Sequence, residues 1–437
     1  MTWLRQSRLA ELTAPRTFLW ATGVEDTFIT APWPASGRTL DEYELTQHYE
    51  RYAADIGLMA DLGVNAVRYG IPWHRINPAP GVWEWDWADR ALNSILDRGI
   101  EPIVDLVHYG LPVWIEGAYL HPDYPAFVAE YASRVAARYR GRIHAYTPLN
   151  EPRITAWYCG YLGWWPPFRR TWTGFVAVLL AICRGIVEPV DALRRVDPEI
   201  LPLHVDATDR YTTTDPQLMG EVAHRQELIF LALDLISGRI TPEHTLWPWL
   251  RDRGATETHL LWFQAHAVEL PLIGLNLYPM FTLKSLTRDA RGAMRWRMPY
   301  ARADLVEQVG NLYWQRYRVP LWISETASVG SIRRRCAWLD DSVRAVRRLR
   351  EGGVPMVGYT WWPLFALVTW AYRQGRHPAA YYLRQMGLWD LDAALERRPT
   401  PLVGQYRDVI KRGLDDVGVL PLREPGPAAD DSRPPRS

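Results

Sequence analysis

Short apolar segments recur along the chain, and each is followed by a segment with helical spacing of apolar residues. The apolar segments lie at 17–22, 64–69, 100–108, 145–151, 201–206, 272–278, 319–326 and 356–362. Nearly continuous apolar runs of this length are typical of parallel strands that are covered on both faces. Eight such strands alternating with helices predict an α/β fold, a single (β/α)8 TIM barrel.

The segments between the strands predict the helices that cover such a barrel. Apolar residues at helical spacing occur at 49–62, 89–98, 124–140, 173–196, 217–237, 257–268, 304–317, 336–351 and 400–413. Residues 1–15 are expected to form an N-terminal arm and residues 16–422 the catalytic barrel. Residues 423–437 are rich in Pro, Asp and Ser, and are expected to be a disordered tail.

Polar and aromatic residues stand at or just past the carboxyl ends of the predicted strands. They are Asp26, Arg68, His108, Asn150, Glu151, Asn276, Tyr278, Glu325 and Trp362. Barrels of this kind carry their active sites on the loops after the strands. We therefore expect these side chains to converge at one mouth of the barrel.

Two glutamates in this set predict the chemistry. Glu151 follows the fourth strand and Glu325 ends the seventh. Cleavage of a glycosidic bond needs one protonated carboxyl for the leaving oxygen and one ionised carboxylate for the anomeric carbon. We expect Arg68 and Tyr278 to hold Glu325 ionised as the nucleophile, and its charge to favour the protonated form of the acid/base Glu151. Asn150 is expected to bond the sugar 2-hydroxyl.

Each of these residues has a simpler interpretation when it is taken alone. A single strand-end glutamate is more often a structural ion-pair partner, and a single His108 is more often a core histidine. Arg68 taken alone pairs with a buried acid, and Trp362 packs in the core. The functional hypothesis depends on the combination of these positions.

Composition narrows the classes of partner. The formal net charge of +1 gives no global attraction to nucleic acid or to an acidic membrane, so neither partner is expected. The 23 Trp and 22 Tyr suit a sugar-binding protein, because sugar rings pack on flat aromatic faces. Three widely spaced cysteines and the lack of an apolar signal segment in residues 1–16 predict reduced thiols and a cytoplasmic location.

The motifs resemble those of family 1 of the glycoside hydrolases, the β-glucosidase-like retaining enzymes. The resemblance covers residues 18–391 and follows the family order. It rests on Thr147-Pro148-Leu149-Asn150-Glu151-Pro152, Ile323-Ser324-Glu325, Val67-Arg68-Tyr69, Pro72-Trp73-His74-Arg75-Ile76, His108-Tyr109, Asn276-Leu277-Tyr278 and Gly358-Tyr359 with Trp362 and Trp370.

The resemblance implies roles for these residues. Glu151 would be the acid/base and Glu325 the nucleophile, which Arg68, Tyr278 and Asn276 would support. The residues implied to contact the sugar are His108, Asn150, Trp362, Trp370, Glu25, Asp26 and Thr369. No metal or organic cofactor is implied, and the partner would be a small-molecule glycoside.

The sequence departs from the family pattern where the far side of the sugar would bind. Glu25 or Asp26 stands in place of the family glutamine after the first strand, and Thr369 stands in place of a glutamate in the last loop. Thr326-Ala327 replaces the Asn-Gly that follows the nucleophile. We therefore expect a modified or non-glucose sugar.

Alternative functions stay open at this point. A transglycosidase would use the same residues. A non-hydrolytic tailoring enzyme on a glycosylated small molecule, or a sugar-binding relic of the fold, would account for the lost sugar contacts. A metal-dependent hydrolase is disfavoured, because the histidines lack a ligand pattern. The sequence leaves open the sugar, the aglycone and the oligomeric state.

Overall fold

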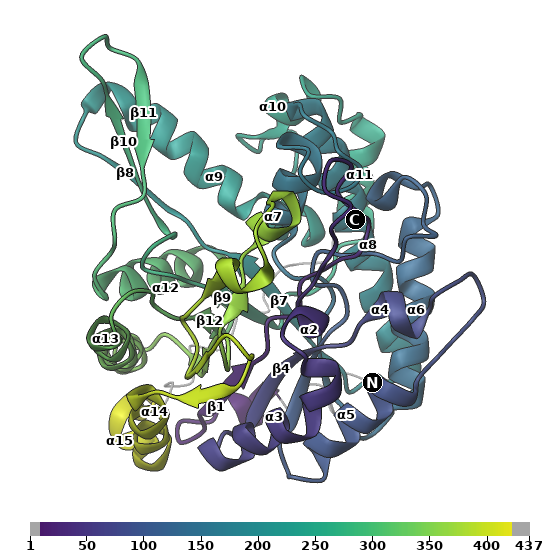
Figure 1. Ribbon diagram of the computed structural model, residues 1–437. Coiled ribbons are helices and arrows are strands. Elements are labelled where there is room, and N and C mark those ends of the chain that lie inside the picture. The colour runs from purple at the N-terminus through teal and green to yellow at the C-terminus, as the bar shows by residue number, and fades with distance from the viewer. Residues whose placement is uncertain (1–8, 422–437) are drawn as a thin grey trace, which may run out of the picture.

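A computed structural model describes residues 9–421. Eight parallel strands form a closed barrel in which each strand neighbours the next barrel strand along the chain (Figure 1). They are β1 (Leu19–Gly23), β4 (Ala66–Gly70), β5 (Glu101–Asp105), β6 (Ala145–Thr147), β7 (Leu201–Ala207), β9 (Leu272–Asn276), β12 (Leu321–Thr326) and β13 (Met356–Trp361). The eight predicted strands and the (β/α)8 TIM barrel are confirmed.

The nine predicted helices are present around the barrel, with ends that differ by a few residues. They are α3 (His48–Leu62), α5 (Asp86–Leu96), α6 (Tyr124–Arg138), α8 (Trp172–Val196), α9 (Met219–Ile236), α11 (Glu257–Ala265), α12 (Asp304–Tyr317), α13 (Ile332–Glu351) and α14 (Pro401–Arg412). α13 begins four residues before the predicted Cys336. The hydroxyl of Ser331 accepts a hydrogen bond from the backbone of Arg334 and caps the helix there.

Shorter elements decorate the loops. The helices are α2 (Glu42–Leu45), α4 (Trp73–Ile76), α7 (Pro152–Ala156), α10 (Trp247–Arg251) and α15 (Leu414–Val417), and the strands are β2 (Phe28–Ile29), β3 (Leu40–Asp41), β14 (Leu367–Val368), β15 (Leu383–Arg384), β16 (Trp389–Leu391) and β17 (Arg397–Pro399). β2, β3 and β14 belong to the loops that follow β1 and β13, so they lie on the side where the strands end.

Two apolar layers hold the barrel. The main core packs the outer faces of the strands against the helices, and a smaller cluster fills the interior. Trp322 is the largest residue of the interior cluster, and a Cβ at Gly358 would lie 2.5 Å from its ring. Glycine at 358 therefore makes room for the indole. Leu9 and Leu12 of the N-terminal arm pack against this interior cluster.

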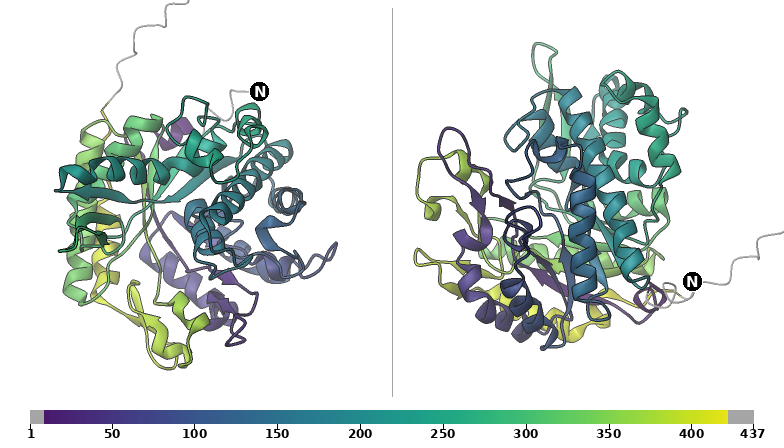
Figure 2. Two further views of the ribbon diagram at one scale, coloured as in Figure 1. Left: turned by 90° about the horizontal axis from the view of Figure 1, so that it is seen from above. Right: turned by 90° about the vertical axis from the view of Figure 1, so that its right-hand side faces the viewer.

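A three-stranded sheet outside the barrel was not predicted. It consists of β8 (Arg210–Thr213), β10 (Leu283–Arg288) and β11 (Met294–Arg297), in the order β11-β10-β8. Figures 1 and 2 show the β10–β11 hairpin standing clear of the helices. Leu286 is its one fully buried side chain, so the hairpin lacks the apolar alternation that identifies a half-buried strand.

The predicted disordered tail, 423–437, lies outside the residues that the structure describes. Within the described part of the chain, no helix combines the length and the apolar character needed to cross a membrane. Cys159, Cys183 and Cys336 are free thiols, and the first two are buried.

Candidate active site

Glu151 lies at the end of the fourth barrel strand in a strained backbone conformation. Its φ of 48° is in the left-handed region, which a non-glycine residue adopts only when its surroundings hold it. Pro152 begins α7 directly after Glu151. The backbone N–H of Glu151 donates to the carbonyl of Val205 on β7. The side chain accepts from Nδ2 of Asn276 at 2.8 Å and from the hydroxyl of Tyr109. Both carboxylate oxygens therefore have a donor.

Glu325 lies near the end of β12 with two donors of its own. Its Oε1 accepts from Nη1 of Arg68 at 2.6 Å, and its Oε2 accepts from the hydroxyl of Tyr278 at 2.7 Å. The side chain is buried, as is that of Glu151. The predicted convergence of Glu151, Glu325, Arg68 and Tyr278 at one mouth is therefore present in the structure.

Asn150 and Asn276 join the two carboxylates through hydrogen bonds. Oδ1 of Asn150 accepts from Nη2 of Arg68 at 2.9 Å and from Nδ2 of Asn276 at 3.2 Å. Since Arg68 also binds Glu325 and Asn276 also binds Glu151, one chain of hydrogen bonds runs between the carboxylates. The arrangement fixes the orientation of the Asn150 amide, because its oxygen faces two donors.

Arg68 forms an ion pair with Asp105, an acid that the sequence analysis did not select. Its Nε donates to Asp105 at 3.0 Å, and both side chains are fully buried. Although burial opposes it, the guanidinium lowers the pKa of Asp105 to about 2. Asp105 is the one acid at the end of the apolar segment 100–108, and a buried acid there requires a buried cation on a neighbouring strand. That signal was available in the sequence.

The protonation of Glu325 differs from the expectation. Burial raises the pKa of Glu325 to about 8, the charge of Glu151 adds to the rise, and Arg68 opposes it. The sequence predicted that Arg68 and Tyr278 would hold Glu325 ionised. Arg68 does favour the ionised form, but burial outweighs it, and depth of burial is not visible in a sequence. A proton on Glu151 removes part of this rise, so ionised Glu325 is most favourable when Glu151 is protonated.

His108 lies between the catalytic network and the first strand. Its Nε2 is 2.9 Å from Nδ2 of Asn150, which leaves the Nδ1–H for Oδ1 of Asp26 at 2.5 Å. Burial raises the pKa of Asp26 to about 6, while His108 opposes the rise. Because Asp26 is wholly buried and contacts Nδ1 of His108, it fixes the orientation of the imidazole.

Glu25 has a different environment from Asp26. Its Oε2 accepts from the indole Nε1 of Trp362 at 3.1 Å, and its Oε1 accepts from Thr27 at 2.6 Å and lies 3.9 Å from Nε2 of His108. Glu25 and His108 are thus adjacent at the mouth. Both candidates for the family glutamine position therefore lie beside His108, Asp26 at Nδ1 and Glu25 near Nε2.

The two predicted tryptophans lie at different depths. Trp362 is buried, with Arg68 above its ring at 4.7 Å and His108 stacked on it. A Cβ at Gly23 would collide with this indole, so glycine is needed where β1 ends. Trp370 is partly exposed and contacts an aromatic group that includes Tyr109 and Trp165.

Thr369 lies between this aromatic group and a buried acid. Its backbone N–H donates to the carbonyl of Tyr382, and the neighbouring Val368 N–H donates to Oε2 of Glu42 at 3.0 Å. Burial raises the pKa of Glu42 well above its ordinary value. Glu42 and Tyr109 were both missed as site residues. Glu42 follows a loop strand and not a barrel strand, so no strand-end pattern identifies it.

Fold and site together define a (β/α)8 barrel that carries a linked pair of buried carboxylates after its fourth and seventh strands. Residues 21–197 match the model of glycosyl hydrolase family 1. This part of the chain is therefore similar to that family.

Curated relatives are similar to this chain over part of their length. The chain is 30% identical over 181 residues to beta-glucosidase 47 of Arabidopsis thaliana, covering 36% of this chain and 34% of the relative. It is 36% identical over 141 residues to a bifunctional beta-D-glucosidase/beta-D-fucosidase of Bifidobacterium breve, covering 30% of each chain. The matched segments thus span about a third of these relatives.

A solved structure matches over nearly the whole fold. The family 1 β-glucosidase from Thermotoga maritima superposes with a TM-score of 0.79 at 20% identity, covering 91% of this chain and 98% of that one. The same enzyme in complex with glucoimidazole gives the same TM-score and coverage. At this identity the likeness establishes the (β/α)8 fold.

Proposed function

We propose that the protein is a retaining β-glycosidase that releases a terminal β-linked sugar from a small glycoside. The observation that carries this proposal is the pair of buried carboxylates, each with its own two donors and joined to the other by one hydrogen-bond chain. A site with one carboxyl protonated and one ionised is what cleavage of a glycosidic bond requires.

In the first step, ionised Glu325 attacks the anomeric carbon and forms an ester bond to the sugar. The bond from that carbon to the aglycone oxygen breaks, and Glu151 gives its proton to this oxygen. In the second step, water gives a proton to Glu151 and its oxygen replaces Glu325 at the anomeric carbon. Two inversions at one carbon leave the β configuration unchanged.

The supporting residues act through these two carboxyls. Arg68 and Tyr278 stabilise the charge on Glu325 before attack and after release. Asn150 would bond the sugar 2-hydroxyl, a contact that strengthens as the oxocarbenium-like centre develops. Asn276 orients Glu151 through its amide.

We propose a deoxy or otherwise modified sugar as the substrate. Thr369 offers no carboxylate for outer hydroxyls, and an unpaired hydroxyl would weaken hexose binding by about 1–3 kcal/mol. The ring faces of Trp362 are occupied by Arg68 and His108, which leaves Trp370 as the more accessible indole. On the side of the first strand, Glu25 supplies a carboxylate 3.9 Å from Nε2 of His108.

The test is a panel of chromogenic β-glycosides of glucose, fucose, galactose and amino- or deoxy-sugars. We expect turnover of a modified glycoside above that of the glucoside, and loss of turnover in Glu151→Ala for poor leaving groups. Transfer to an added alcohol at the expense of hydrolysis would identify the transglycosidase. Binding of a glycoside without turnover of any member of the panel would favour the tailoring enzyme or the sugar-binding relic.

The pH dependence tests the environment of Glu325. Because its pKa is raised to about 8, its ionised fraction falls as the pH drops, so we expect the acid limb of kcat/KM well above pH 4.5. Tyr278→Phe removes a donor to the charged form and should move this limb to higher pH. An acid limb near pH 4.5, or one that Tyr278→Phe leaves in place, would contradict this account.

Tyr109 is expected to position the acid/base carboxyl. Its hydroxyl donates to Glu151 and accepts from Nδ2 of Asn150 at 2.9 Å, and burial raises its pKa well above the ordinary value, so it remains a donor. We expect Tyr109→Phe to lower kcat/KM about tenfold for an alkyl glycoside, whose departure needs a proton. A dinitrophenyl glycoside needs no such proton and serves as the control. Equal losses on both substrates would indicate a structural role only.

A further inference from the structure

Positive charge is concentrated on the extra-barrel hairpin and the residues that flank it, 281–302, which we name the basic arm. It contains Lys284, Arg288, Arg291, Arg295, Arg297 and Arg302 against a single acid, Asp289. Its formal charge is therefore +5, whereas that of the whole chain is +1. Within residues 9–421, neither Arg291 nor Arg297 has an acidic partner. The near-zero net charge conceals a strongly cationic segment.

The same segment exposes large apolar side chains. Trp296 is 54% exposed, Met298 44% and Tyr300 41%, and Met294 and Phe281 are 38% exposed each. Residues 290–300 form an unbroken exposed run. Exposed apolar residues are ordinary when they are scattered, but a contiguous group beside Arg291 and Arg297, which have no acidic partner among the described residues, indicates a binding surface.

The strand register places the exposed apolar side chains of β11 on one face of the hairpin. Met294 and Trp296 of β11 pair with Arg288 and Leu286 of β10, whereas Arg295 and Arg297 pair with Thr287 and Ser285. Cross-strand partners share a face, so the indole and Met294 lie on one face with Leu286. Arg288 shares this face, and Lys284 lies over the Trp296 ring at 5.5 Å. Arg295 and Arg297 lie on the other face, so cations stand on both faces and the exposed apolar side chains of the strands on one.

The basic arm extends the rim on which the candidate active site lies. β8 starts three residues after the end of β7, and β10 starts seven residues after the end of β9, so both continue from the carboxyl ends of barrel strands. In Figure 1 and in the right-hand view of Figure 2, the hairpin tip projects past the surrounding helices. It can therefore reach a flat surface before the barrel does.

We propose that the basic arm docks the protein on an anionic lipid surface, with Trp296, Met294 and Met298 in the headgroup region and the arginines on lipid phosphates. Tryptophan and tyrosine favour the membrane interface, and clustered Lys and Arg bind anionic leaflets. A nucleic acid would bind the cations but would make no favourable contact with the exposed methionines. The surface would thereby bring the mouth of the barrel toward membrane-borne molecules.

The experiment is co-sedimentation of the full chain with vesicles of phosphatidylcholine alone and with 30% phosphatidylglycerol. We expect binding to the anionic vesicles only, with the partition coefficient falling as salt rises. Arg295→Gln with Arg297→Gln should lower that coefficient about 25-fold, at roughly fivefold for each cation near the surface. Trp296→Ser should lower it several-fold and leave the salt dependence unchanged, because it removes an apolar contact.

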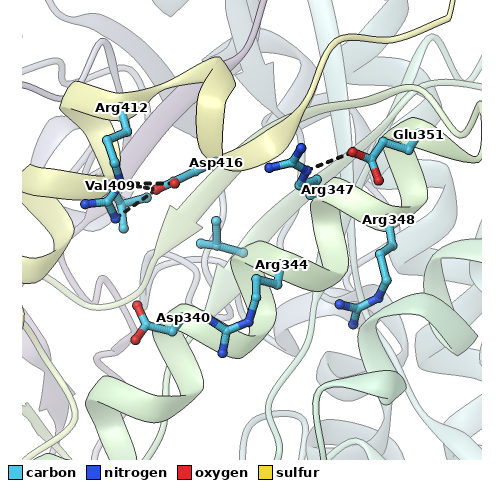
Figure 3. A pocket seen from close by; sticks show the side chains of 9 residues that line it. Asp340, Arg344, Arg347, Arg348, Glu351, Val409, Arg412 and Asp416 are labelled. Atoms are coloured by element: carbon cyan, nitrogen blue, oxygen red, sulfur yellow. Dashed lines mark hydrogen bonds and ion pairs between the residues drawn. The ribbon is translucent and has the colours of Figure 1, made fainter.

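The matched control is Arg344→Gln with Arg347→Gln on α13. These arginines line a cavity of about 450 Å³ with Arg348, Arg412 and the acids Asp340, Glu351 and Asp416 (Figure 3). Arg344 is paired with Asp341 and Arg347 with Glu351. In the tested pair Arg295 is paired with Asp289, whereas Arg297 has no acidic partner among the described residues. The control changes the net charge equally and should keep vesicle binding.

Each remaining outcome counts against the proposal. Equal loss in the control pair would mean that net charge alone drives binding. Binding to a DNA duplex or heparin that Trp296→Ser does not weaken, without vesicle binding, would assign the arm to a polyanion. A concentration-dependent dimer that Trp296→Ser dissociates, without vesicle binding, would assign it to a second copy. Circular dichroism of each variant verifies that the barrel is folded.

Discussion

Glu325→Gly is expected to lower kcat for any accepted β-glycoside by at least about 10,000-fold, because covalent catalysis loses its nucleophile. Azide is small enough to enter the space left by the carboxylate. Added azide should restore turnover of an activated glycoside and give a glycosyl azide of inverted configuration, which nuclear magnetic resonance identifies. The native enzyme should give products of retained configuration.

The same experiment discriminates between mechanisms. The native chain serves as the control, because its Glu325 carboxylate is present and leaves no space for azide. If the native product has inverted configuration, the two-step mechanism is wrong and Glu325 acts as a base toward water. If Glu325→Gly retains full activity, the nucleophile lies elsewhere in the site.

Arg68→Leu is expected to cause the largest loss of stability among single changes in the site. Its guanidinium is fully buried and pairs with buried Asp105 and Glu325. Removing one member of a buried ionic group leaves the other charges unpaired, which lowers the free energy of unfolding by about 3–5 kcal/mol. Urea denaturation measures this change.

Arg344→Leu is the control for that measurement. Its side chain is 59% exposed and pairs with an exposed Asp341, so its loss should change the free energy of unfolding by less than about 1 kcal/mol. The double variant Arg68→Leu with Asp105→Leu should regain part of the lost stability, since the most deeply buried unpaired charge is then absent. A loss in Arg68→Leu no larger than that in the control would mean that the ionic group has little structural weight.

A substitution of Arg68 is expected to affect both the free energy of unfolding and the charge on Glu325. Arg68 contacts the proposed nucleophile Glu325, the buried acid Asp105 and the amide of Asn150 at once. One side chain therefore joins the stability of the barrel mouth to the charge on the catalytic carboxyl. Glu25 and Thr369 lie outside this chain of contacts, so the sugar specificity can vary without disturbing it.

The sequence by itself determined the barrel fold and which residues lie at the mouth of the barrel. Strand and helix periodicities are local, and in a parallel barrel all strands end on the same side. Residues at strand ends such as Arg68, Glu151 and Glu325 therefore had to meet, whatever the details of packing. Asp105 could also have been identified, because a buried acid at a strand end requires a cation.

Tertiary structure decided what depends on depth and on contacts between distant segments. The raised pKa of Glu325 follows from burial, and the separation of Glu25 from Asp26 follows from which of them reaches Trp362. The hydrogen bond from Tyr109 to Glu151 joins two loops. The strands of the basic arm were not predicted from the sequence, because they bury little apolar surface and therefore show no alternation of apolar and polar residues.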